Sequence, residues 1–237
     1  MKTSIIKISA LLIFLCTIAP VTAQINRTLD TKVADILAQL PTKNLAHSDA
    51  LMEDMINLNT AGILKFCDML VPLGSGDDTQ ARYAINSVAI YSGGKNTPIG
   101  SNVVEDALLT AIENTSNSEI KTFLIQRLAH CGSNASTALL SGYLANAELY
   151  NPALATLTTI NSEAAINAIL KSAQESKGLK QAAHIEALGN LKHSSAVAFL
   201  ETLAVSNETL TRKTALMALA KIGSASSYNT LATAAKN

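Results

Sequence analysis

Three features of the sequence predict an all-α fold, a right-handed α-solenoid of about six two-helix repeats. From residue 125 to the C-terminus, similar segments recur about every thirty residues. Within each segment the apolar residues follow helical spacing, and long runs with the period of two that marks β-strands are missing. A repeat of this length indicates stacked helical units, since no single unit can bury its own apolar face.

Equivalent apolar positions define the register of the last four repeats. The first set recurs in steps of 29, 31 and 31 residues and comprises Ile125, Leu154, Ile185 and Leu216. The other sets are Leu128, Leu157, Leu188 and Leu219; Cys131, Ile160, Leu191 and Ile222; and, in the second helix of each repeat, Leu140, Ile169, Leu200 and Leu231. We expect these side chains to form a core that neighbouring repeats share.

Residues 1–23 have the pattern of a signal peptide. Two lysines precede an apolar run over residues 8–18, and a small-residue cleavage pattern ends at Ala23. The run is shorter than the roughly 20 residues that a membrane span needs. The sequence therefore predicts export to the periplasm or the extracellular space, with a mature chain that starts at Gln24 and contains no transmembrane segment. Acylation of Cys16 is a weaker alternative, because this residue lies inside the apolar run.

The rest of the chain divides into a leader and the solenoid. Residues 24–46 form an N-terminal leader with a capping helix near 29–40, which Pro41 ends. Residues 47–237 form the solenoid. Its expected helix pairs are 47–58 with 60–70, 79–91 with 102–114, 118–131 with 134–145, 147–160 with 162–174, 178–191 with 194–205, and 207–222 with 225–235.

The joints between paired helices share one short sequence pattern. Four of them read Gly132-Ser133, Asn161-Ser162, Lys192-His193-Ser194 and Gly223-Ser224. Glycine or asparagine adopts the left-handed conformation that ends a helix, and serine caps the helix that follows. The connection over residues 93–100 is longer and rich in Gly and Pro; a tolerated surface insertion and a binding loop are both open for it.

Two-helix repeats of this size, with the pattern Leu-x-x-Leu-x-x-Ile/Cys in the first helix and a serine-capped second helix, resemble HEAT repeats. The likeness covers residues 47–237. A narrower likeness lies in residues 76–88 and 118–128, which resemble the N-terminal HEAT region of secreted bacterial proteins that carry a 3-keto-disaccharide hydrolase domain. This resemblance implies a sugar-processing context with the solenoid as an accessory module. The chain departs from that family because no β-rich hydrolase segment follows the solenoid.

Composition argues against several classes of function. Signal cleavage would leave 16 basic and 18 acidic residues, and tryptophan is absent, so the chain lacks the basic stripe and stacking aromatics of a nucleic-acid binder. No two of the four histidines have the i, i+4 spacing of a helical metal site, and we expect them to be partly exposed. Cys67 and Cys131 fall on apolar helical positions, which favours buried free thiols over a disulfide.

No catalytic, cofactor-binding or metal-binding residue is predicted. The acids at residues 53–54, 77–78 and 105–106 are adjacent in sequence, so on a helix their side chains point about 100° apart and cannot flank one glycosidic bond. Capping and solvation explain these acids better, and a cross-repeat pair is left open. Serine motifs for nucleophilic catalysis and phosphate-binding loops are also missing.

The only plausible contact residues are aromatic and basic side chains outside most of the repeating apolar positions, namely Arg82, Tyr83, Arg127, Tyr143 and Tyr150. Tyr and Arg are favoured anchors at interfaces. Packing of Tyr83 and Tyr143 between repeats is the alternative. The leading hypothesis is an exported non-catalytic scaffold that binds a protein, one candidate being a glycoside-processing hydrolase. Two alternatives remain: an enzyme or enzyme fragment acting on (3-keto-)disaccharides or glycosides, and a remnant of a longer protein.

Overall fold

The computed structural model describes residues 27–94 and 100–236, and all regular structure in these two ranges is helical. They contain thirteen α-helices and two short 3₁₀ turns, without a strand. The predicted signal peptide, most of the 93–100 connection and Asn237 lie outside the described residues.

The helices follow the predicted pairs closely. The N-terminal helix α2 spans Leu29–Leu37, inside the expected capping helix. The first helices of the six pairs are α3 (Leu45–Asn57), α5 (Thr79–Ser92), α7 (Ser118–Cys131), α9 (Tyr150–Ile160), α11 (Gly178–Leu191) and α13 (Thr209–Ile222). The second helices are α4 (Asn59–Cys67), α6 (Ser101–Asn114), α8 (Asn134–Tyr143), α10 (Glu163–Glu175), α12 (Val197–Leu203) and α14 (Tyr228–Ala234).

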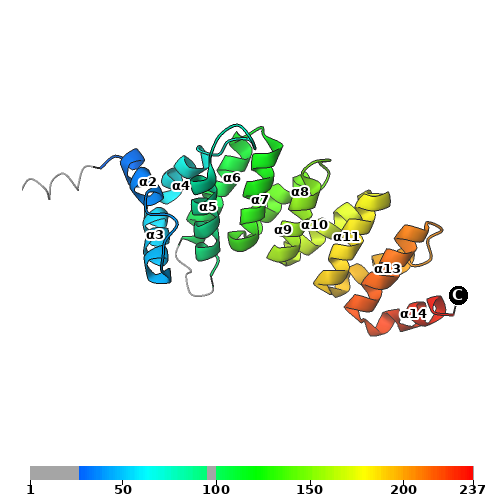
Figure 1. Cartoon of the computed structure of the whole chain (residues 1–237). Coiled ribbons are helices and arrows are strands. Elements are labelled where there is room, and N and C mark those ends of the chain that lie inside the picture. The colour runs from blue at the N-terminus through cyan, green and yellow to red at the C-terminus, as the bar shows by residue number, and fades with distance from the viewer. Residues whose placement is uncertain (1–26, 95–99, 237) are drawn as a thin grey trace, which may run out of the picture.

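The pairs are stacked in one elongated row, with α2 at one end and α13 and α14 at the other (Figure 1). Each first helix packs against the first helix of the next repeat, and the contact of α11 with α13 is the most extensive of all. The chain is thus an α-solenoid, in which each repeat is sandwiched between its neighbours.

Most of the predicted core positions are buried. Leu128, Leu157, Leu188 and Leu219 are all completely inaccessible to solvent, as are Leu140, Ile169 and Leu200 of the second helices. In the set that begins with Cys131, Ile160, Leu191 and Ile222 are only partly buried. In the last repeat Leu216 and Leu231 are also only partly buried, and α14 buries no residue. The period read from the sequence therefore identifies the shared core. In the last repeat, burial is lower because no further described repeat covers one of its sides.

The joints confirm the expected chemistry in part. Asn161, Lys192 and Gly223 have positive φ angles of 49°, 54° and 69° and end their helices in the left-handed conformation. Gly132 does not, because its φ of −71° and ψ of 147° are extended. Ser133 and Ser162 cap the next helix through their side chains.

In the last two repeats the serine caps are replaced. His193 accepts the backbone N–H of Ser195, and Ser224 makes no capping bond, so a 3₁₀ turn precedes both α12 and α14.

The two cysteines in the described part of the chain are buried free thiols, as predicted. Burial raises the pKa of both Cys67 and Cys131 to about 12. They behave as small apolar residues, since the thiolate that would react is strongly disfavoured. None of the helices in residues 27–94 and 100–236 has the length and hydropathy needed to cross a membrane.

Candidate interaction surfaces

Three of the five predicted contact residues lie on two neighbouring first helices. Arg82 and Tyr83 are on α5, and Arg127 is on α7. The two helices lie side by side in the row (Figure 1). The ring of Phe123 brings the two arginines together, because it lies 4.8 Å from the guanidinium carbon of Arg82 and 4.9 Å from that of Arg127.

Arg82 is fully engaged by its own chain. Its Nε–H donates to both carboxylate oxygens of Asp78 at 2.9 Å, and its Nη atoms donate to the two oxygens of Glu119 at 2.8 and 3.0 Å. Nη2 also donates to the carbonyl of Val71 at 3.1 Å. These ion pairs raise the pKa of Arg82 further, with Glu119 the main contributor. Arg82 therefore ties α5 to α7 and to the preceding loop, and two carboxylates neutralise its charge.

Arg127 has the opposite environment. Its side chain is half-buried and donates to the amide oxygen of Asn86 on α5, and its Nε is buried without a hydrogen-bond partner. Among the described residues no carboxylate forms an ion pair with it. Burial lowers the pKa of this guanidinium, which nevertheless stays charged. The positive charge of Arg127 is thus uncompensated within the described ranges.

Exposed apolar side chains accompany this charge. Tyr83 and Ile90 on α5 are 40% and 49% exposed. They lie three residues before and four residues after Asn86, so they share its side of the helix. We call the surface formed by Tyr83, Ile90, Phe123 and Arg127 the α5–α7 face.

The other two predicted contact residues lie elsewhere and are partly buried. Tyr143 ends α8, and the ammonium of Lys121 lies 5.6 Å from the centre of its ring. Tyr150 begins α9, where the ammonium of Lys180 lies 5.2 Å from its ring. The structure therefore groups Arg82, Tyr83 and Arg127 on one surface and does not bring the two tyrosines into it.

Sequence reasoning missed a buried polar pair between α10 and α11. His184 is completely buried, which corrects the prediction that it is partly exposed. Its Nδ1 lies 2.6 Å from the carbonyl oxygen of Lys180 and its Nε2 lies 3.0 Å from the Ser172 hydroxyl. Burial lowers the pKa of His184 and favours the neutral ring. The pair links two repeats, and no described pocket opens onto it.

At least one acid of each predicted acidic pair has a structural partner. Glu53 accepts a hydrogen bond from the Tyr91 hydroxyl at 2.8 Å, and Asp78 pairs with Arg82. Glu105 of α6 is 5% exposed, and its Oε1 accepts hydrogen bonds from Ser133 and Ser136 at the start of α8. Within residues 27–94 and 100–236, no group of three or more His, Cys, Asp or Glu is arranged to hold a metal ion.

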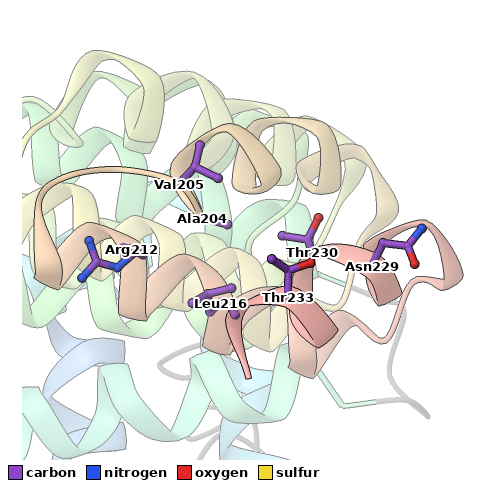
Figure 2. A pocket seen from close by; sticks show the side chains of 8 residues that line it. Ala204, Val205, Arg212, Leu216, Asn229, Thr230 and Thr233 are labelled. Atoms are coloured by element: carbon purple, nitrogen blue, oxygen red, sulfur yellow. The ribbon is translucent and has the colours of Figure 1, made fainter. Parts of the chain in front are cut away.

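A cavity at the C-terminal end of the solenoid has a volume of about 680 Å³. Figure 2 shows its walls: Arg212 and Leu216 project from α13, Ala204 and Val205 come from the end of α12, and Asn229, Thr230 and Thr233 come from α14. Arg212 is held here by a hydrogen bond from its Nη1 to the carbonyl oxygen of Ser206, at 2.7 Å. This cavity is an open, mostly apolar groove.

Comparison with known proteins agrees with the architecture. Residues 163–237 match the family model described as HEAT repeats. A comparison with curated proteins finds no match. The matched range covers the last two helix pairs and α10 before them, and the preceding pairs continue the same stacking. The chain is therefore an α-solenoid whose residues 163–237 are similar to HEAT repeats, and such repeats suggest a helical scaffold or interaction module.

Proposed function

We propose that this chain is an exported, non-catalytic interaction module that binds a protein partner through the α5–α7 face. The proposal rests on the different charge environments of the two arginines that lie against the ring of Phe123. Arg82 is neutralised by Asp78 and Glu119, whereas Arg127 has no carboxylate partner in the described part of the chain. A half-buried charge of this kind gains most from a carboxylate that a partner supplies.

The surroundings of Arg127 suit a protein side chain. Tyr83 and Ile90 offer exposed apolar area on α5, and the Phe123 ring holds the guanidinium in place. Tyr and Arg that are held in place by packing are frequent anchors of protein interfaces, because little side-chain entropy is lost on binding. A partner segment with an acidic residue next to an apolar one fits this face.

Capture of the partner from the extracytoplasmic fraction tests the proposal. Substitution Arg127→Met keeps the apolar stem beside Phe123 and removes the charge, and we expect it to reduce capture roughly tenfold or more. Tyr83→Ala truncates an exposed side chain of the same face and should also reduce capture of the partner. Lys171→Met removes one exposed charge from α10 and serves as the matched control. Equal capture by wild type and both face variants, with unchanged melting curves, contradicts the proposal.

Export is part of this proposal and is supported by the sequence of residues 1–23. We expect N-terminal sequencing of the protein from the native host to begin at Gln24, and fractionation to recover the protein outside the cytoplasm. An intact Met1 on protein recovered from the cytoplasm contradicts export. This outcome would leave the role of the α5–α7 face to be judged by the capture experiment alone.

The most specific part of the proposal is a link to carbohydrate processing. It is supported by the likeness of residues 76–88 and 118–128 to the HEAT region of 3-keto-disaccharide hydrolase-domain proteins. We expect the captured partner to be a separate hydrolase that acts on such disaccharides or on glycosides. A captured partner without activity on carbohydrates contradicts this link, and turnover of a disaccharide by the purified chain itself contradicts the non-catalytic role.

A further inference from the structure

One side of α13 has residues equivalent to those with which α11 contacts α13, but no further described repeat packs against it. One repeat earlier, three residues of α11 at i, i+4 and i+8 face α13, namely Gln181, Ile185 and Gly189. The equivalent residues of α13, 31 positions later, are Arg212, Leu216 and Ala220. We call these three residues the C-terminal face.

The internal interface shows what this kind of surface binds. Ile185 is completely buried there, and the Thr211 hydroxyl lies 3.4 Å from Oε1 of Gln181. At Gly189 the helices touch, since a Cβ on this residue would lie 2.8 Å from the Cα of Ala218. The surface thus receives a helix that presents Thr211 and, seven residues later, Ala218.

On the C-terminal face the same positions are uncovered. Leu216 is only partly buried and Ala220 is exposed. Arg212 replaces Gln181, and no described carboxylate forms an ion pair with it. Arg212 and Leu216 of this face also line the groove of about 680 Å³ in Figure 2. A helix that docks here needs small residues seven apart and an acid near the first of them.

Helix α2, at the opposite end of the row, has these features. Its buried residues are Val33 and Ile36. Thr31 and Ala34 on its other side are exposed, as is Ala38, the C-cap residue. Thr31 and Ala38 are seven residues apart, as Thr211 and Ala218 are. Asp30 lies beside Thr31 with its side chain 76% exposed, paired only with the exposed Lys65. When Thr31 takes the place of Thr211, Asp30 takes the place of the neighbouring Leu210 and adds a negative charge at the end of the helix that meets Arg212.

The net charges of the two ends are complementary. Residues 27–68 contain six acidic and four basic side chains, whereas residues 192–236 contain five basic and two acidic ones. Two such ends on different molecules attract each other, and the attraction weakens as salt screens it.

From these observations we propose that a second copy of this chain docks head to tail, with Thr31 and Ala38 of its α2 against Arg212, Leu216 and Ala220 of α13. The contact joins two different surfaces, so each added copy leaves one end of each kind open and the assembly can extend. It goes beyond the proposed function, because it uses the ends of the row and leaves the α5–α7 face free.

Sedimentation velocity on the purified protein tests the proposal. We expect the weight-average mass to rise about twofold between about 5 and 200 µM, and to fall again in roughly 0.5 M NaCl. Ala38→Arg blocks one surface and Ala220→Arg blocks the other, and each variant should remain monomeric. Ala164→Arg places the same side chain on an exposed position of α10 and should associate like the wild type.

Mixing the two blocked variants gives the sharpest outcome. Ala38→Arg retains an intact C-terminal face and Ala220→Arg retains an intact α2, so the mixture should form a heterodimer and nothing larger. A monomeric wild type at about 200 µM, association unchanged in both variants, or a mixture that stays monomeric overturns the proposal. Arg212→Glu tests the charge pair separately. This variant should associate more weakly than the wild type, and adding Asp30→Lys to the same chain should restore association.

Discussion

Replacing Glu105 with alanine is expected to lower the free energy of unfolding by about 2–4 kcal/mol. This single carboxylate oxygen accepts four hydrogen bonds from the next repeat. The backbone N–H groups of Ser133 and Ser136 donate at 2.7 and 3.0 Å, and their hydroxyls donate at 3.0 and 2.6 Å. Glu105 on α6 therefore caps the first turn of α8, and its loss leaves the buried N–H and hydroxyl of Ser136 without this acceptor.

Urea denaturation of matched variants measures this effect. Asp106→Ala removes the neighbouring acid, which is exposed, and should change stability by no more than about 0.5 kcal/mol. Glu105→Gln keeps an acceptor oxygen but loses the charge, and should fall between the wild type and Glu105→Ala. Equal stability of the Glu105→Ala and Asp106→Ala variants contradicts the capping role.

The same site predicts a dependence on pH. Burial acts to raise the pKa of Glu105, but the hydrogen bonds from Ser136 and Ser133 outweigh it and hold the pKa below its usual value. A carboxyl with a lowered folded pKa stabilises the fold fully above its unfolded pKa of about 4.3 and loses this contribution as the pH falls through the folded pKa. The stability difference between wild type and Glu105→Gln should therefore shrink in acid. A difference that stays constant as the pH falls through this range argues against an ionised Glu105.

Replacing Gly189 with alanine is expected to destabilise the protein by about 1–3 kcal/mol, although alanine favours helices more than glycine does. The added methyl group would lie 2.8 Å from the Cα and 2.9 Å from the Cβ of Ala218. Backbone atoms cannot rotate away, so α11 and α13 must separate along their extensive contact. Separation costs packing at Leu188 and Leu219, which are fully buried.

Gly142→Ala is the matched control for this change. Gly142 also lies in a helix, but a Cβ there meets no atom within 4 Å. The control should gain about 0.5–1 kcal/mol from helix propensity. Thermal melting of both variants measures the difference, and a Gly189→Ala protein as stable as Gly142→Ala would show that the two helices are less tightly packed than described.

Much of the fold was predictable because the repeat is a local pattern. Residues 31 positions apart, such as Leu157, Leu188 and Leu219, occupy equivalent environments and are all fully buried. Helix ends were also predictable where one residue type decides the backbone, as at Asn161 and Gly223. In both cases neighbouring residues or a fixed period contain the information.

Contacts between repeats were not predictable to the same degree. Glu105 and Asp106 are adjacent acids, yet one caps a helix about 30 residues later and the other is exposed. His184 is buried because Ser172 of the preceding helix faces it. The sequence gives the residue types, but which side chains meet depends on how far each repeat rotates against the next.

The candidate surface shows the same limit. Sequence reasoning selected Arg82 and Arg127 as equal candidates, since both are basic and lie outside the apolar positions. The two arginines differ because Asp78 and Glu119, which lies one repeat after Arg82, neutralise Arg82, whereas no described acid pairs with Arg127. The C-terminal groove was not predicted. The sequence shows which positions of the repeats are equivalent, but not which of them a neighbouring helix covers.

The helical pairs of this chain stack in one open row and share their apolar surfaces. Small-angle X-ray scattering on the Ala220→Arg variant at low concentration tests it most directly, since self-association cannot then lengthen the particle. A compact domain of this size has a radius of gyration of about 17–18 Å. We predict a clearly larger value with the scattering profile of an elongated particle, as in Figure 1. A radius of about 17–18 Å with a globular profile would contradict the solenoid.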